Sequence, residues 1–403
     1  IKEMKRFYPL LLILASVGLI QFSCSQTSNN TGLNGLSADA LQLATEKLQE
    51  YIDSSKFAGI SALIYKDGET VYRENLGYTD LESEKPMEDN TIFRIFSMTK
   101  PVTAVALMTL YDQRKFNLDD KLSQFIPEFT DTKVYNQETK SIEPQNNELT
   151  VRHLLTHTSG IPYGWDQNTY VDSLYRELGA GGWDGTIGEK VKIMATIPLK
   201  NQPGTKWEYG LSIDVAGYLV EVLSGKPLDE YMKTVIFDPL GMDDTGFYAP
   251  EEKHNRLSGL YSRQSGSLEP ARGDMSLAFK NPVTLFAGGA GLVSTMNDYL
   301  DFCKMLLNGG ELNGTRILSE EAVILIMSNQ LPSNVTYREN MGYGLAGGVN
   351  LTNGEYGWAG AASTKFWINP KQNMIVITMA QLMPADYSYA DAFKKVVDRA
   401  VVN

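Results

Sequence analysis

The sequence predicts an α/β (α+β) fold in which one mixed, antiparallel sheet is flanked by helices and interrupted by a mostly helical insert. Strand-forming runs lie near both ends of the 403-residue chain. Amphipathic helices precede the first pair of strands and follow the last pair. Residues 119–282 instead carry short helical stretches punctuated by tryptophan, glycine and proline, with little strand signal. We therefore expect the two ends of the chain to build one sheet around the insert.

The first elements are a helix and a hairpin. Residues 37–53 place apolar side chains at helical spacing behind a serine that can act as the N-cap. Residues 59–65 are rich in strand formers, and Lys66-Asp67-Gly68 signals a turn. Residues 69–78 then have the composition of a return strand. A second, apolar helix is predicted over residues 102–110.

The later elements complete the pattern. Residues 212–223 predict a helix that ends at Ser224-Gly225, and the glycine-rich run 288–292 leads into a helix that begins around 295–298. Residues 364–369 and 373–380 predict two strands, and 387–401 a final helix. We place the α/β part at about 37–118 and 285–403, and the helical insert at about 119–284.

Composition and charge exclude several classes of function. The net charge is −12, and no basic cluster with interleaved aromatic residues is present, which argues against nucleic-acid binding. The chain has no P-loop and no strand-linked GxGxxG, so nothing in it points to a nucleotide. Two cysteines and three scattered histidines make a structural zinc site a poor expectation. We expect no metal and no cofactor.

The N-terminal residues have the layout of an export signal. Lys5 and Arg6 precede an apolar run over residues 10–20, which is too short for a comfortable membrane span. Ser23 and Cys24 follow, and then a polar stretch. This arrangement resembles a bacterial lipoprotein signal, although Gln21 stands where a leucine is usual. We expect a signal peptide over 1–23, lipidation of Cys24, and a tether over 24–36.

The chain would then be an exported periplasmic or cell-envelope lipoprotein that meets the membrane only through this anchor. Ordinary signal cleavage nearby is the alternative. The second cysteine, Cys303, lies in an amphipathic run and is expected in the core.

Ser97-Met98-Thr99-Lys100 is the first stretch that points to chemistry. The hydroxyl and the amine are three residues apart at the start of the predicted 102–110 helix, so they share a helix face and the amine can reach the serine oxygen. A weak hydroxyl nucleophile needs an adjacent base and N–H groups that hold an oxyanion. The alternative is a helix cap followed by a solvated lysine.

Longer stretches of sequence show a family resemblance. The chain resembles the serine hydrolases related to class C β-lactamases, penicillin-binding proteins and family VIII carboxylesterases, and the likeness covers nearly all of the chain after the signal. The stretches that carry it are Phe96 to Lys100, Leu149 to Ile161, Tyr209 just before the 212–223 helix, Phe237 to Phe247, Gly288 to Thr295, and Tyr356 to Ala361.

The resemblance implies a β-lactamase/transpeptidase-like fold and a role for each matching residue. Ser97 would be the acylated nucleophile, and Lys100 the amine that shares a proton with it. Tyr209 would act with that lysine as general base and then as acid to the leaving group. The backbone N–H groups of Ser97 and Ala361 would form the oxyanion hole.

The chain departs from the family in two places, and both bear on the substrate. Leu211 stands where an asparagine usually contacts an acylamino group, and Trp358-Ala359-Gly360 replaces the Lys-Thr-Gly of β-lactamases, whose lysine helps to hold a carboxylate. Both changes favour an apolar ester over an anionic amide. We take Trp358, Ala359, Gly360, Leu211 and Tyr163 as candidate substrate-binding residues.

Three functions remain open on sequence alone. The first is a cofactor-free serine hydrolase that acts as a carboxylesterase on small apolar esters. The second is a peptidase or β-lactamase-like amidase that acts on D-amino acid substrates. The third is a lipid-tethered binding protein that is acylated but does not turn over. His153 and His157 are four residues apart, but no carboxylate follows at ligand spacing, so we expect no metal there.

Overall fold

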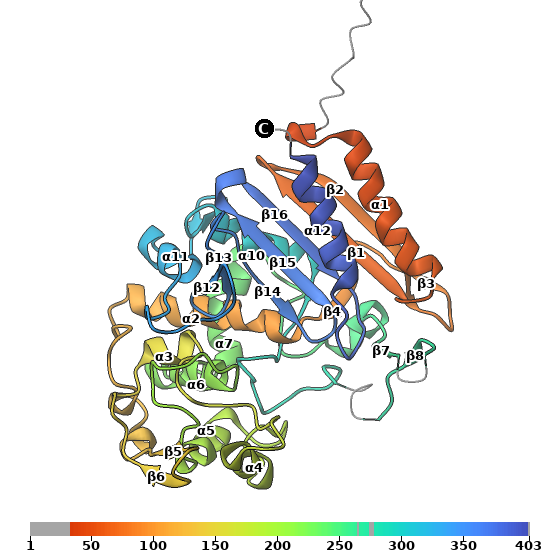
Figure 1. Ribbon diagram of the computed structural model, residues 1–403. Helices are drawn as coiled ribbons and strands as arrows, with labels where there is room; N and C mark the ends of the chain where they lie inside the picture. Colours follow the sequence, from red (N-terminus) through yellow and green to blue (C-terminus); the bar gives the residue numbers. More distant parts are fainter. Residues whose placement is uncertain (1–32, 264–265, 274–277, 402–403) are drawn as a thin grey trace, which may run out of the picture.

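The computed structural model describes residues 33–263, 266–273 and 278–401 (Figure 1). The predicted signal peptide, Cys24 and the tether up to residue 32 lie outside the described residues. No helix in the described ranges is long and apolar enough to cross a membrane.

The centre of the molecule is an eight-stranded sheet with the strand order β12-β13-β14-β15-β16-β1-β2-β3. β1 pairs antiparallel with β16, so strands from the two ends of the chain meet in the middle of the sheet. The predicted sheet is confirmed. Its strands are β1 (Gly59–Lys66), β2 (Glu69–Asp80), β3 (Lys85–Pro86), β12 (Met341–Tyr343), β13 (Gly348–Asn350), β14 (Tyr356–Gly360), β15 (Thr364–Asn369) and β16 (Met374–Met379).

Helices cover both faces of this sheet. α1 (Ala38–Asp53) and α12 (Ser388–Ala400) lie side by side over one face (Figure 1). α2 (Thr99–Asp112) and α10 (Met296–Leu307) belong to the core on the other face. Successive strand residues point to opposite faces, and β1 accordingly sends Ile64 to the α1–α12 core and Leu63 to the other.

A mostly helical region follows α2 and lies beside one end of the sheet (Figure 1). α6 packs against α2, and this contact joins the two parts of the core. Helical elements in this region are α3 (Val151–Leu155), α4 (Tyr170–Glu177), α5 (Ile187–Thr196), α6 (Ser212–Ser224), α7 (Leu228–Met232), the turn Lys233–Phe237 and α8 (Asp238–Leu240). A further helix, α11 (Glu320–Met327), contacts α2.

The sequence pattern misses the short strands, and it also does not resolve the helices α4, α5 and α11 individually. β4 (Ile92–Arg94) pairs with β9 (Val293–Thr295), while β5 (Val134–Asn136) with β6 (Ser141–Glu143) and β7 (Tyr261–Ser262) with β8 (Glu269–Pro270) form small hairpins. Two or three residues are too few to show a period-two pattern. The β4–β9 pair matters most, because it joins the segment that carries Ser97 to the glycine-rich segment at 288–292.

Candidate active site

Ser97 lies in a 3-10 turn, Phe96–Met98, between β4 and α2. The predicted helix therefore begins earlier than residue 102, at Thr99, and Pro101 falls in its first turn, where no N–H is needed. Phe96 has a φ of +40°, a strained conformation for a bulky residue. Its ring packs against Phe279 with centroids 5.2 Å apart, so tertiary packing holds the sharp turn that presents Ser97.

The structure brings Ser97, Lys100 and Tyr209 together. Lys100 Nζ lies 3.1 Å from Ser97 Oγ, and the Tyr209 hydroxyl lies 2.8 Å from the same oxygen. The lysine is fully buried, with 0% of its surface exposed. Lys100 Nζ also lies 4.7 Å from the centroid of the Tyr209 ring. A hydroxyl that contacts both an amine and a phenol is placed to lose its proton to that pair.

Tyr163 and Gly289 complete the surroundings of the Lys100 amine. Nζ donates to the Tyr163 hydroxyl at 2.8 Å and to the Gly289 carbonyl at 2.7 Å. Tyr163 was predicted as a substrate-binding residue, and it does line the Ser97 pocket, but its hydroxyl is also a direct partner of the amine. Burial, with the neighbouring Tyr209 and Asp214, raises the pKa of Tyr163 well above its ordinary value, so this phenol keeps its proton.

Asp214 is a site residue that sequence reasoning missed. It lies in the first turn of α6, is buried, and lines the same pocket as Ser97. One carboxylate oxygen accepts the Gly289 N–H at 3.1 Å, so Gly289 joins Asp214 to Lys100. Burial raises the pKa of Asp214, and the Lys100 charge acts in the opposite direction. The available signal was an acid in the first turn of a largely apolar helix, just after Tyr209, although Glu221 in the same helix gives a similar one.

His157 forms an aromatic wall behind the site. Its ring centroid lies 4.9 Å from that of Tyr209 and 5.7 Å from that of Tyr343. Burial, helped by the Lys100 charge, holds the pKa of His157 well below its ordinary value, so the ring is neutral. His153 instead accepts the Thr150 N–H at the start of α3. Among the described residues, no three His, Cys, Asp or Glu side chains are grouped as metal ligands.

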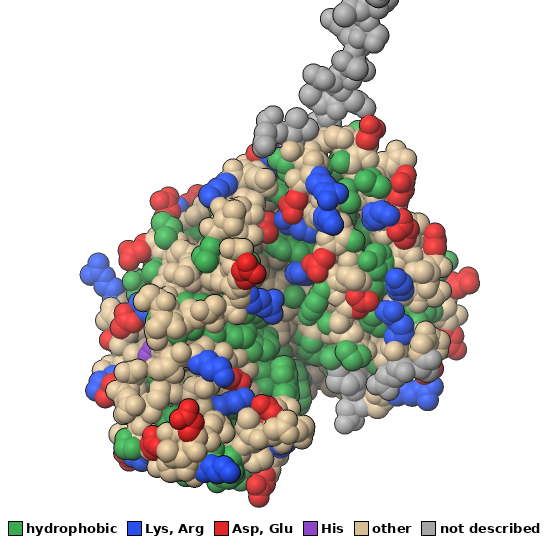
Figure 2. All heavy atoms as spheres, viewed as in Figure 1, with side chains coloured by type: hydrophobic (Ala, Val, Ile, Leu, Met, Phe, Trp, Pro, Cys, Tyr) green, Lys and Arg blue, Asp and Glu red, His purple; other side chains and the backbone are tan. Residues whose placement is uncertain are grey.

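The Ser97 pocket has a volume of about 250 Å³. Apolar side chains form most of its wall, and Figure 2 shows hydrophobic side chains gathered in the hollow between the helical region and the sheet. Leu211 and Ala361, both predicted site residues, line it. Trp165 and Trp183 stand at its rim with 67% and 59% of their surfaces exposed. The pocket therefore suits a small apolar group, and its rim can extend apolar contact.

Trp358, Ala359 and Gly360 lie on β14 and do not line this pocket. The Trp358 ring is half-buried beside Tyr209, with centroids 5.7 Å apart. Gly360 is needed for a close approach, because a Cβ there would come 2.1 Å from the Ile95 carbonyl oxygen. This contact seats the end of β14 against the Ser97 segment and brings Ala361 to the pocket.

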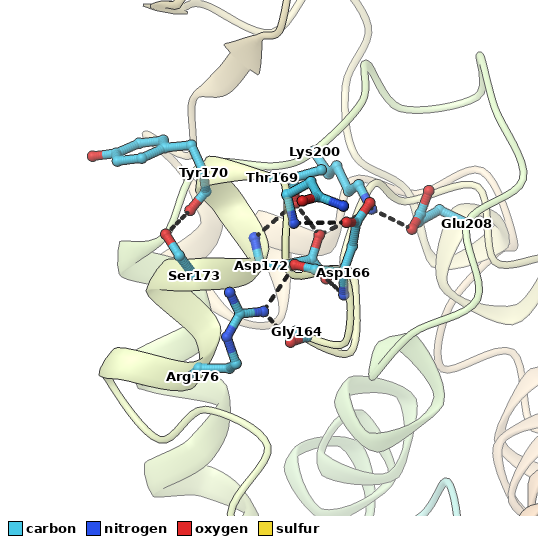
Figure 3. A network of polar contacts seen from close by, with 10 residues as sticks. Gly164, Asp166, Thr169, Tyr170, Asp172, Ser173, Arg176, Lys200 and Glu208 are labelled. Atoms are coloured by element: carbon cyan, nitrogen blue, oxygen red, sulfur yellow. Dashed lines mark hydrogen bonds and ion pairs between the residues drawn. The ribbon is translucent and has the colours of Figure 1, made fainter.

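A partly buried ion-pair network holds the two segments that carry Tyr163 and Tyr209 (Figure 3). Lys200 Nζ lies 2.9 Å from Asp172 and 2.8 Å from Glu208, the residue before Tyr209. Asp166, three residues after Tyr163, lies 3.9 Å away. Burial disfavours the Lys200 charge, but the bonds from Glu208 and Asp172 outweigh it and raise the pKa of Lys200. One ammonium thus ties the Tyr163 loop to the Tyr209 segment.

Comparisons with known proteins show which family the chain belongs to. The family model named Beta-lactamase matches residues 44–399. Protein Rv1367c of Mycobacterium tuberculosis is 30% identical over 362 residues, which cover 84% of this chain and 89% of the relative. Esterase EstB of Burkholderia gladioli is 33% identical over 244 residues, or 59% of this chain and 58% of EstB.

A solved structure, that of EstCE1, described as a hydrolase with promiscuous acyltransferase activity, has a TM-score of 0.75 and 25% identity. The match covers 89% of this chain and 98% of that chain. The predicted β-lactamase/transpeptidase-like fold is thereby confirmed. The chain belongs to the β-lactamase family and is a serine hydrolase.

Proposed function

We propose that this protein is a carboxylesterase that cleaves small apolar esters through an acyl-enzyme on Ser97. The observation that carries the proposal is the position of Ser97 Oγ, which contacts both Lys100 Nζ and the Tyr209 hydroxyl at the wall of an apolar pocket. The similarity to an esterase and to the hydrolase EstCE1 supports it. A cavity of about 250 Å³ lies below the range of drug-sized ligand sites, which favours small substrates.

The geometry supports a two-step reaction. As Ser97 Oγ attacks the ester carbonyl carbon, its proton passes to the Lys100–Tyr209 pair. The backbone N–H groups of Ser97 and Ala361 would hold the oxyanion. The bond to the alcohol oxygen then breaks, and the leaving alkoxide takes the proton from the pair. Water repeats the attack on the acyl-enzyme, which releases the acid and restores Ser97.

Tyr163 and Gly289 would keep the amine in place during both steps. Each accepts one N–H of Lys100, so Nζ is held at hydrogen-bond distance from Ser97 Oγ. Pre-positioning of this kind lowers the entropic cost of reaching the transition state. No metal or cofactor has a part in the proposed reaction.

The pocket favours an ester over a β-lactam or a peptide. Leu211 offers an apolar wall where an amide of the substrate would need a hydrogen-bond partner. Trp358 supplies an indole beside Tyr209 in the place of a carboxylate-binding lysine.

Three probes of the purified protein test the assignment together. A fluorophosphonate should label the protein once, and a panel of p-nitrophenyl esters should be turned over with a preference for short or medium acyl chains. A chromogenic cephalosporin should be cleaved far more slowly. The Ser97→Ala variant is the control, because it loses only the nucleophilic oxygen and should lose labelling while it stays folded.

Other outcomes would favour the alternatives. Labelling without turnover would favour an acylated binding protein, and efficient cleavage of the cephalosporin or of D-amino acid peptides would favour an amidase. Wild-type labelling of Ser97→Ala would place the nucleophile elsewhere.

A further inference from the structure

A second, polar cavity of about 290 Å³ shares no lining residue with the Ser97 pocket. Its walls come from β2, β3 and β4, from the 3-10 helix Glu251–Arg256, and from residues 257–261, 270–271 and 280. Nothing in the proposed esterase reaction uses it. The side chains that line it make it a candidate binding site of a different chemical character.

Arg94 is the residue that sets this cavity apart. Only 1% of its surface is exposed. Its Nε donates to the Ala278 carbonyl at 3.0 Å and its Nη1 to the Ser258 carbonyl at 2.7 Å. Within the described residues, Nη2 makes no hydrogen bond and no carboxylate forms an ion pair with the guanidinium. Two neutral acceptors orient this cation, but they do not neutralise it.

The other buried cations show how unusual this is. In the described part of the chain, Lys66, Lys190 and Lys394 are buried, and each has a carboxylate partner within 2.8 Å. The two buried cations without such a partner are Lys100 and Arg94. Lys100 belongs to the Ser97 site, where an amine is needed. Arg94 is left as a buried charge that faces a cavity.

The rest of the wall adds positive charge. Lys85 and Lys280 also line the cavity, against a single carboxylate, Asp80, one oxygen of which already accepts from Ser83. His254 Nε2 lies 2.8 Å from the Lys280 carbonyl, so the backbone that carries Lys280 is fixed to the wall. Cations outnumber carboxylates here, although the whole chain has a net charge of −12.

We propose that this cavity binds a small oxyanion, a carboxylate or a phosphate group, with Arg94 as the anchor and Lys280 as the second cation. A guanidinium suits the paired oxygens of such groups, and Arg94 lines the cavity with only its Nε and Nη1 engaged among the described residues. An anion would supply the counter-charge that the described protein lacks around Arg94. Burial lowers the pKa of Arg94 to about 10, which leaves it charged at neutral pH.

Calorimetry and thermal unfolding of the whole protein test the site with inorganic phosphate and succinate as separate probes. Sodium chloride at equal ionic strength is the reference. We expect saturable binding of at least one probe and a saturable rise in Tm above the chloride value. The preferred probe distinguishes a phosphate from a carboxylate ligand. Protein already labelled with fluorophosphonate should bind equally well, because the Ser97 pocket is not involved.

Variants then locate the binding. Lys280→Gln should weaken the affinity at least tenfold, and Arg94→Gln should abolish binding. Lys253→Gln is the matched control: it removes the same charge from the helix beside the cavity, but Lys253 does not line the cavity. If Arg94→Gln fails to fold, the anion affinities of Lys280→Gln and Arg94→Lys test the proposal instead. Arg94→Lys keeps the positive charge but loses the planar set of N–H donors of the guanidinium. Wild-type affinity in Lys280→Gln and Arg94→Gln, or no effect of either anion beyond chloride, would overturn the proposal.

Discussion

Lys100 and Tyr209 contact the same oxygen of Ser97, so the structure predicts that they act as one unit. Lys100→Ala and Tyr209→Phe should each lower kcat by about 10²–10⁴-fold, the range for loss of a positioned proton-transfer group. The double variant should be only slightly slower than either single one, because a shared function is lost once. Steady-state kinetics on a p-nitrophenyl ester check this. Losses that multiply would mean that the two residues act independently.

Substrate preference is a second property set by single residues. We expect p-nitrophenyl butyrate to be favoured over nitrocefin by at least about a thousandfold in kcat/KM. A β-lactam carries a carboxylate that Trp358 cannot neutralise and an amide that Leu211 cannot hydrogen-bond, and the two losses together cost about 4 kcal/mol, or three decades in rate.

Trp358→Lys should shift this ratio toward the anionic substrate, and Trp358→Phe, which adds no charge, should leave it nearly unchanged. Equal rates for the two substrates in the wild-type protein would contradict the esterase proposal.

The buried Asp214 carboxyl group beside the site should lower the stability of the folded protein at neutral pH. Its pKa is raised in the folded protein, so its ionisation at neutral pH costs folding free energy. Asp214→Asn should therefore raise Tm by about 2 °C at pH 7. Below the ordinary aspartate pKa of about 3.9, the carboxyl group is protonated in both the folded and the unfolded state, and the gain should vanish. Thermal unfolding from about pH 3 to pH 8 measures this, and a variant less stable than wild type at pH 7 would refute it.

At the scale of elements, the Lys200 network links the loop that carries Tyr163 to the segment that carries Tyr209. Lys200→Met would leave the carboxylates of Asp172 and Glu208 in partly buried positions without their cation. We expect a loss of about 2 kcal/mol of stability and at least a tenfold fall in kcat/KM for esters, because both tyrosines would lose their fixed positions.

Lys200→Arg should restore part of both quantities, since it keeps the charge. Lys192→Met, at an exposed position on α5, is the matched control and should change neither. A Lys200→Met protein with wild-type kinetics would show that the network is not needed to place the tyrosines. The pKa of Asp172 is lower in the folded protein than its ordinary value, and this fixes the direction of the pH dependence. The stability that the network contributes should be lost as the pH falls below about 3.9.

Several of the longer elements could be predicted from the sequence, whereas α4, α5 and α11 were not predicted as individual helices. The hairpin of β1 and β2, the strands β15 and β16, and the helices α1, α6 and α12 all lie within a residue or two of their predicted bounds, and α10 begins where it was predicted to begin. The β4–β9 pair could not be predicted, because three-residue strands show no period. That pair nevertheless fixes the Ser97 segment against the glycine-rich segment.

For the whole molecule, the sequence predicted contacts that are local or that rest on family motifs. Ser97 and Lys100 lie on one helix face, so their contact follows from spacing. Tyr209 was found through the family resemblance. The contacts of Tyr163 and Asp214 with the Lys100 environment depend instead on how the helical region folds back onto α2, and no spacing rule describes that. The polar cavity lined by Arg94 and Lys280 could not be predicted for the same reason, because its wall comes from segments that are distant in the sequence.

Export and anchoring are the last whole-molecule properties that the sequence predicts, and we propose that Cys24 is acylated. The described chain begins beside its own C-terminal helix, where Leu36 bridges to Val401. In a bacterial host, the wild-type protein should fractionate with membranes and incorporate a radiolabelled fatty acid. Cys24→Ser should abolish the label and release active protein, while Cys303→Ser, in the core, should keep both. A wild-type protein that carries no label would show that the signal is cleaved in the ordinary way.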